Sequence, residues 1–204
     1  MAQYRLHCFG ESGNAYKAAL GLTLAGLEWE AVFVDFFKGA TRTPEFRALN
    51  PMGEVPVLET PEGVLTQSGA ILAHLAKVNG RYGDPADAEV LRWLLWDNHK
   101  GSTNQGMLRF LRNFLPEEKR NADVIAFTQG RVDAGLKVLD AHLQGHDWLA
   151  GGGLTIADLS ACAYLYYPEP FGYDPTTYPA ISVWLERIKA EPGWLHPYDL
   201  MPRA

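Results

Sequence analysis

The chain has 204 residues, of which 47% are hydrophobic and 21% charged, so it can bury one large core or two smaller ones. Eighteen basic against 24 acidic residues give a net charge of −6. This balance argues against nucleic acid or an anionic membrane as partner, since both attract cations. The chain shows neither a secretion signal nor an apolar stretch of membrane-spanning length, so we expect a cytoplasmic protein.

Strand and helix patterns alternate in the first 80 residues. Runs rich in β-branched and aromatic residues predict strands over 3–9, 29–36, 55–60 and 64–68. The second of these is expected to be buried. Helical spacing predicts helices between the turn GESGN and Gly26, over 43–50, and over 68–78. Thr43 is the expected N-cap of the short helix, with Pro44 at its first position.

Strand patterns disappear after the polar stretch 79–85, which contains glycine and proline and is predicted to be a linker. Long helical patterns cover 86–113 and 120–144, and further helices follow Thr155 and surround Trp184. The T-x-x-D pattern of Thr155 and Asp158 predicts a capping box, so we assign Asp158 to stability and not to catalysis.

Three sites in the first half of the chain could carry chemistry: the Val55-Pro56 dipeptide, the Gln67-Ser68 pair, and the turn that contains Ser12. Pro56 interrupts a strand, so it needs an edge position or a cis bond; a cis bond would leave the Val55 backbone groups free to pair with an extended peptide. Gln67 and Ser68 begin a helix, where free N–H groups suit a carboxylate and the Gln67 amide suits an ammonium. Ser68 is also an ordinary N-cap.

Ser12 lies in the turn before the first helix, with Asn14 two residues later. A hydroxyl and a helix N-terminus at this place would both stabilise a thiolate. Lowering a thiol pKa from roughly 8.5 to 7 takes about 2 kcal/mol, which one charge-assisted hydrogen bond and the helix dipole can supply. Without a ligand nearby, Ser12 would simply be a helix cap.

The chain resembles the cytosolic glutathione transferases over nearly its whole length. The resemblance rests on SGNAYK, on NPMGEVPVLE with Val55 and Pro56, on LTQSGAILAHLA with Gln67 and Ser68, and on GLTIADLSACA. It implies a thioredoxin-like glutathione-binding domain over 1–78, a linker over 79–85 and an all-helical domain over 86–204.

The resemblance also implies roles for the site residues. A cis Pro56 would let the Val55 backbone pair with the cysteinyl part of glutathione, and Gln67 with Ser68 would hold its γ-glutamyl end. Ser12 takes the position of the thiol-activating serine of serine-type members, with Asn14 as a possible second donor. Tyr4 and Cys8 come too early in the chain for that role.

Glu54 departs from the family pattern, because an acidic side chain beside Val55 would repel the glycyl carboxylate of glutathione. Lys38 or Arg42, in the loop before the second helix, could supply the cation for that carboxylate, although either could be a solvated loop charge. A pocket for the second substrate is expected between the domains. The candidate residues there are Trp96, His99, Lys100 and Met107.

We therefore predict a homodimeric glutathione transferase that presents the glutathione thiolate to a small electrophile, with glutathione as co-substrate and no metal. One alternative is a glutathione-dependent peroxidase or disulfide-bond reductase on the same fold. The other is a non-catalytic interaction protein. Cys8 and Cys162 have no metal-binding or disulfide spacing, so both are expected to be buried.

Overall fold

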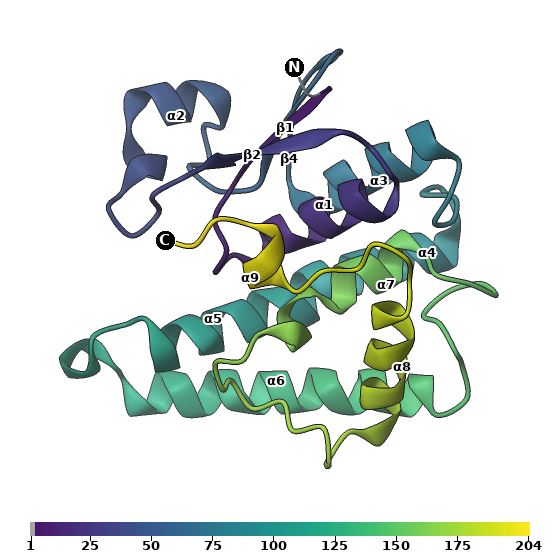
Figure 1. Cartoon of the computed structure of the whole chain (residues 1–204). Coiled ribbons are helices and arrows are strands. Elements are labelled where there is room, and N and C mark those ends of the chain that lie inside the picture. Colours follow the sequence, from purple (N-terminus) through teal and green to yellow (C-terminus); the bar gives the residue numbers. More distant parts are fainter. Residues whose placement is uncertain (1–2) are drawn as a thin grey trace. The chain divides into compact units, whose positions relative to one another are not determined.

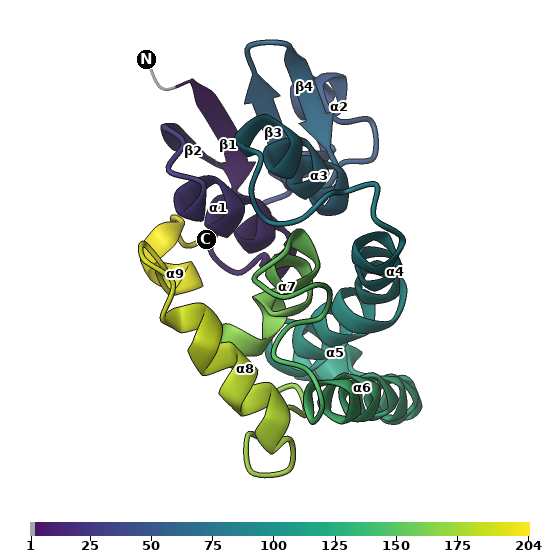
Figure 2. The same ribbon diagram turned by 90° about the vertical axis from the view of Figure 1, so that its right-hand side faces the viewer.

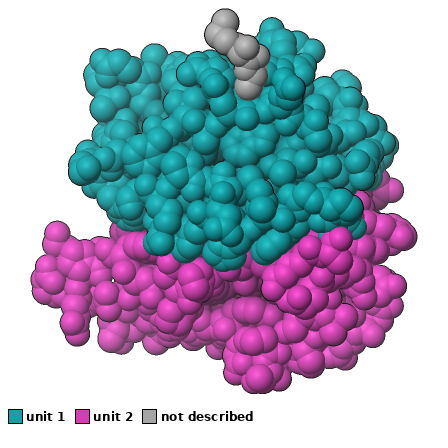
Figure 3. All heavy atoms as spheres, viewed as in Figure 1, with its two compact units in different colours: residues 1–85, 191–204 teal, residues 86–190 magenta. Residues whose placement is uncertain are grey.

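The computed structural model describes residues 3–204, which divide into two compact units (Figure 3). The first unit extends to Pro85 and also contains Glu191–Ala204; the second is Ala86–Ala190. The predicted helical domain begins at the same boundary, but its last segment, 191–204, belongs to the first unit. The reason is that helix α9 (Pro197–Leu200) packs on helix α1 (Gly13–Leu24) (Figure 1).

The first unit is built on a four-stranded sheet in the order β2-β1-β3-β4. Its strands are β1 (Tyr4–Cys8), β2 (Trp29–Phe33), β3 (Val57–Thr60) and β4 (Gly63–Thr66). Strand β1 is parallel to β2 and antiparallel to β3, and β3 forms a hairpin with β4. This is the predicted thioredoxin-like arrangement, with the strands and helices in the predicted order.

Helices cover both faces of the sheet (Figure 2). Leu6 and Leu58 are fully buried cross-strand partners on the face of α1 and α3 (Ser68–Asn79). The next pair, His7 and Val57, faces α2 (Pro44–Leu49), whose Phe46 contacts both. Strand β2 was expected to be buried, and this was wrong, because it is an edge strand with mostly exposed side chains.

Local capping determines the start of α2. The Thr43 side chain accepts a hydrogen bond from the Phe46 N–H at 3.2 Å, and Pro44 occupies the first turn. Both features were predicted, because the proline ring fixes a helical φ and the first N–H groups need no partner within the helix.

The second unit contains helices and no strand within Ala86–Ala190. The α-helices are α4 (Ala88–Trp96), α5 (Ser102–Asn113), α6 (Ala122–Leu143), α7 (Ile156–Ala161) and α8 (Pro179–Lys189). Shorter 3-10 segments are Glu117–Lys119 and Ala163–Tyr166, and another, Ala40–Arg42, lies in the first unit. In residues 3–204 no helix is both long and apolar enough to cross a membrane.

A π-helical segment, Asp97–Gly101, interrupts the long helix predicted over 86–113. The buried Asp97 carboxylate accepts hydrogen bonds from the Ser102 N–H at 3.1 Å and from the Ser102 hydroxyl at 2.8 Å. Its other oxygen accepts from the Ser160 hydroxyl of α7. Such π segments are rare and occur mostly as single turns inside α-helices, as this one does between α4 and α5.

Asp158 connects three parts of the helical unit. Its carboxylate accepts from the Thr155 N–H in the predicted capping box, from the Leu149 N–H and from the Trp184 indole, each at 2.9 Å. Burial raises the pKa of this carboxyl, and the hydrogen bonds oppose that rise. The structural role assigned to Asp158 agrees with these contacts.

We predict that Asp158→Ala lowers the free energy of unfolding by about 3 kcal/mol or more, because several buried donors lose their acceptor at once. Urea titration measures this change. Asp147→Ala is the matched control: its carboxylate is exposed and forms a surface ion pair with Arg187, so this substitution should cost less than about 1 kcal/mol. Equal effects of the two substitutions would contradict the assignment.

Candidate functional site

Strand register brings the predicted site segments to one end of the sheet. His7 pairs with Val57 across β1 and β3, and Val57 pairs with Thr66 across β3 and β4. Because both pairings are antiparallel, the residues after β1, before β3 and after β4 lie at the same end. These are the turn containing Ser12, the Val55-Pro56 dipeptide and the start of α3.

Ser12 is the N-cap of α1. Its side-chain oxygen accepts the Ala15 N–H at 3.2 Å, its own N–H donates to Phe9 O at 3.1 Å, and it is largely buried. The capping bond uses the oxygen as an acceptor, so the hydroxyl hydrogen remains able to donate to a bound ligand. Ser12 therefore combines a rigid position with a free donor at a helix N-terminus.

Asn14 lies two residues later, in the first turn of α1, and is partly buried. Its side-chain oxygen is buried and has no hydrogen-bond partner within residues 3–204. The structure shows no bond between this amide and Ser12. The unpaired atom is an acceptor, so the suggested role of second donor to a thiolate would fall to the Asn14 amide nitrogen.

The Val55-Pro56 peptide bond is cis, one of the two arrangements that the sequence allowed. Pro56 is buried and Val55 is half-buried. Ladder pairing starts at Val57, and the Val55 backbone makes no hydrogen bond with any other described residue. Its N–H and C=O are consequently available to an extended peptide in the manner of an added strand.

The start of α3 differs from the prediction at one residue. Ser68 was expected to be the N-cap, but the N-cap is Gln67, which has a positive φ of 67° and makes no capping bond. Ser68 is instead the first helical residue. The first helical hydrogen bond runs from the Ile71 N–H to Gln67 O. The preceding N–H groups thus have no capping partner among the described residues, and the buried Ser68 side chain lies beside them, an arrangement suited to an anion.

Glu54 lies beside Gln67. Its carboxylate accepts a hydrogen bond from the Gln67 amide at 3.3 Å, and the same amide contacts the Met52 sulfur at 3.3 Å. The carboxylate is thus next to the N-terminus of α3. From the sequence, we expected the Glu54 side chain to repel the glycyl carboxylate of glutathione. Its contact with Gln67 instead gives the Glu54 carboxylate a position suited to pairing with an ammonium group.

The two candidate cations in the loop before α2 differ in their partners. The Lys38 ammonium forms an exposed ion pair with Asp35 at 2.9 Å, which raises the pKa of Lys38 and lowers that of Asp35. Arg42 ends the 3-10 segment, is exposed, and has no ion pair within the described part of the chain. Arg42 is therefore the more available cation.

Neither cysteine can act as a nucleophile in this state. Both are buried, and neither forms a disulfide within residues 3–204. Burial raises the pKa of the Cys8 thiol to about 12, so it stays protonated near neutral pH. No cluster of three or more metal-ligating side chains occurs within residues 3–204.

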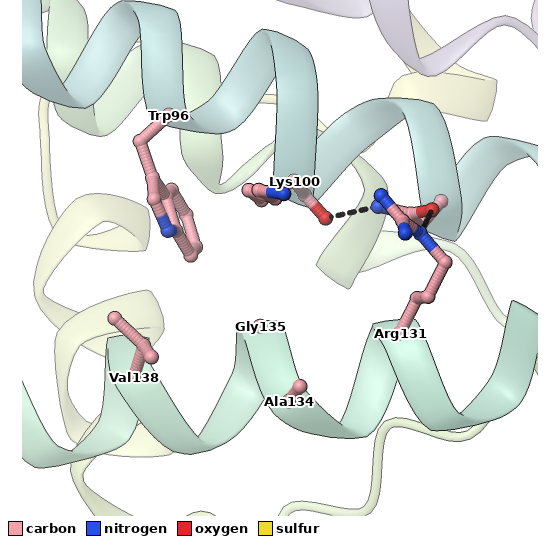
Figure 4. Close-up of a pocket in the computed structure, with 7 residues that line it drawn as sticks. Trp96, Lys100, Arg131, Ala134, Gly135 and Val138 are labelled. Atoms are coloured by element: carbon pink, nitrogen blue, oxygen red, sulfur yellow. Dashed lines mark hydrogen bonds between the residues drawn. The ribbon is translucent and has the colours of Figure 1, made fainter.

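A cavity of about 310 Å³ lies within the helical unit, between α6 and the helix that runs from α4 through α5 (Figure 4). Trp96 and Lys100 line one side, and Ala134, Gly135 and Val138 line the other. Arg131 donates to the Asn104 side-chain oxygen at 2.9 Å. Of the residues proposed for the second substrate, Trp96 and Lys100 line this cavity, whereas His99 and Met107 do not.

Sequence reasoning missed two charged residues near Ser12. The Glu11 carboxylate is buried and accepts a hydrogen bond from Arg203 Nε at 3.2 Å. These residues lie 192 positions apart, and no local pattern in the sequence relates them.

Comparison with known proteins identifies the family. Residues 2–77 match the glutathione S-transferase N-terminal domain, and residues 106–192 match the C-terminal domain. Glutathione S-transferase 3 of Zea mays is 31% identical over 207 residues, covering 95% of this chain and 92% of that protein. The chain therefore belongs to the glutathione S-transferase family.

Two further matches are a protein with a different named activity and a solved structure. The disulfide-bond oxidoreductase YfcG of Escherichia coli is 27% identical, covering 91% of this chain and 90% of that protein. A crystal structure of a possible glutathione S-transferase from Rhodopseudomonas palustris is 35% identical with a TM-score of 0.88. The match covers 96% of this chain and 98% of that one.

Proposed function

We propose that the protein is a glutathione transferase that binds glutathione at the end of the sheet in the first unit. The main support is the unpaired Val55 backbone close to the uncapped start of α3. An extended tripeptide needs main-chain partners at its centre and an anion site for its α-carboxylate. The Val55 backbone and Ser68 meet these needs, with Glu54 and Gln67 beside the ammonium.

In this proposal the Ser12 hydroxyl donates a hydrogen bond to the glutathione thiolate. The thiol proton leaves to solvent, and the sulfur forms a bond to an electrophilic carbon whose leaving group departs with its electron pair. A charge-assisted hydrogen bond contributes about 1.5–3 kcal/mol and the N-terminus of α1 about 0.3–1 kcal/mol. Together they match the roughly 2 kcal/mol needed to ionise half of the thiol at pH 7.

We predict that Ser12→Ala lowers kcat/KM for an aryl halide by about 10²-fold, the usual effect of removing one donor that stabilises reacting charge. The pKa in the pH–rate profile should rise, because the thiolate loses its donor, while glutathione binding should change little. Steady-state kinetics across pH and calorimetry measure the two effects. An unchanged rate and pKa would exclude Ser12 and favour Asn14 or a backbone amide.

A second prediction concerns Glu54, which we propose pairs with the γ-glutamyl ammonium. Glu54→Gln should weaken glutathione binding by about tenfold or more, since a charged hydrogen bond is lost. N-acetylated glutathione, which lacks the ammonium, should bind equally to wild type and variant. Glu62→Gln, at the exposed hairpin turn, is the control. Tighter glutathione binding by Glu54→Gln would indicate repulsion of the glycyl carboxylate instead.

A glutathione-dependent disulfide-bond reductase is the second candidate, supported by the similarity to a disulfide-bond oxidoreductase. The same thiolate would attack a disulfide sulfur and displace the other sulfur as a thiolate. Since Cys8 and Cys162 are buried, the reacting thiol would be that of glutathione. Faster turnover of a glutathione mixed disulfide than of any aryl halide would favour this reaction over conjugation.

We further propose that the protein is a homodimer. Several large apolar side chains are exposed on the helical unit, among them Leu91 and Leu95 of α4 and Phe127 and Val138 of α6. A dimer would remove such surface from water. Sedimentation velocity should give twice the chain mass, and Phe127→Asp should shift the equilibrium toward monomer if α6 contributes to the interface. A monomeric wild type would contradict this proposal.

A further inference from the structure

The end of the chain returns to the first unit and lies along α1 and the turn that precedes it (Figure 1). The Tyr16 hydroxyl of α1 donates to Leu195 O at 2.8 Å, before α9 begins. After α9, the Gly10 N–H donates to Pro202 O at 2.6 Å. We call residues 201–204 the tail; its Met201 is buried.

The tail also neutralises a buried charge in the turn. The Glu11 carboxylate accepts a hydrogen bond from Arg203 Nε through Oε1 at 3.2 Å and another from the Ala204 N–H through Oε2 at 3.0 Å. The Glu11 side chain is only 4% exposed, whereas that of Arg203 is 59% exposed. The Arg203 guanidinium lies 4.0 Å from the Tyr198 ring centre, so α9 holds it toward the turn.

The close approach of the tail depends on Gly10. A Cβ atom there would lie 3.2 Å from Arg203 Cγ and 3.3 Å from both Pro202 O and the Tyr198 ring. These distances are tighter than ordinary van der Waals contact, so a side chain at position 10 would displace the tail. The tail is therefore packed directly against the backbone of the turn.

Both residues immediately before Ser12 are thus held by the tail, Gly10 through its backbone and Glu11 through its side chain. We propose that Arg203 and Pro202 position the Ser12 hydroxyl for thiolate stabilisation, with Glu11 as the link. This inference rests on the proposed function of Ser12. A donor must be held within about 0.5 Å of its productive position, and a displacement of 1 Å can cost up to about 10²-fold in rate.

The test compares wild type with Arg203→Ala, Glu11→Gln and deletion of residues 202–204. Each change should reduce kcat/KM near neutral pH by about tenfold. Each should also raise the pKa of the bound thiol in the pH–rate profile and in a direct titration of thiolate absorbance, while glutathione affinity stays within about twofold. Because Arg203 and Glu11 contact each other, their effects should not add, and the double variant should be no worse than the more severe single one.

Arg92→Ala is the matched control, since Arg92 is also a partly exposed arginine paired with a glutamate, Glu89 of α4. It should leave rate and thiol pKa unchanged. If Glu11→Gln folds poorly, Arg203→Ala and the deletion still decide the question, and urea midpoints monitor folding.

The outcomes distinguish failure of the proposed glutathione transferase function from failure of the positioning role of the tail. A wild type that neither binds nor ionises glutathione would overturn the proposed function and with it this inference. An active wild type whose tail variants keep the same thiol pKa and rate would overturn only the positioning role. A lower urea midpoint with an unchanged thiol pKa would also overturn it, because the tail would then serve stability alone.

Discussion

The site depends on the register of β1, β3 and β4. Because His7 pairs with Val57 and Val57 with Thr66, the turn after β1, the Val55 backbone and the start of α3 come to one end of the sheet. A slip of one residue would turn each side chain of the shifted strand to the opposite face. Val57 would then lose its packing against Phe46, so burial of this core enforces the register that assembles the site.

Local backbone structure fixes the groups that we propose bind glutathione. Ser12 is held by its capping bond to Ala15, and the first N–H groups of α3 stay open because its N-cap, Gln67, makes no capping bond. Donors that are already oriented lose little free energy on binding and stabilise charge without reorganisation. The contacts of Glu11 with Arg203 and Ala204 of the tail hold the turn that precedes Ser12 in the same way.

Local patterns predicted the features that local chemistry determines. The cap at Thr43, the strands around the 61–63 turn and the capping box at Asp158 could all be identified from neighbouring residues. The π segment, the pairing of Glu54 with Gln67 and the return of 191–204 could not, because each depends on side chains that meet only after folding. The exposure of β2 was missed for a related reason: strand composition does not reveal which strand lies at an edge.

The most direct test of the proposed site is calorimetric titration of wild type and Ser68→Ala with glutathione. Alanine keeps the helix and its N–H groups but removes the hydroxyl from the proposed carboxylate site. Our account predicts saturable binding to wild type and binding about tenfold weaker to the variant, as expected when a hydrogen bond to a charged group is lost. Absence of binding to wild type at millimolar glutathione, or equal affinities of the two proteins, would contradict this assignment.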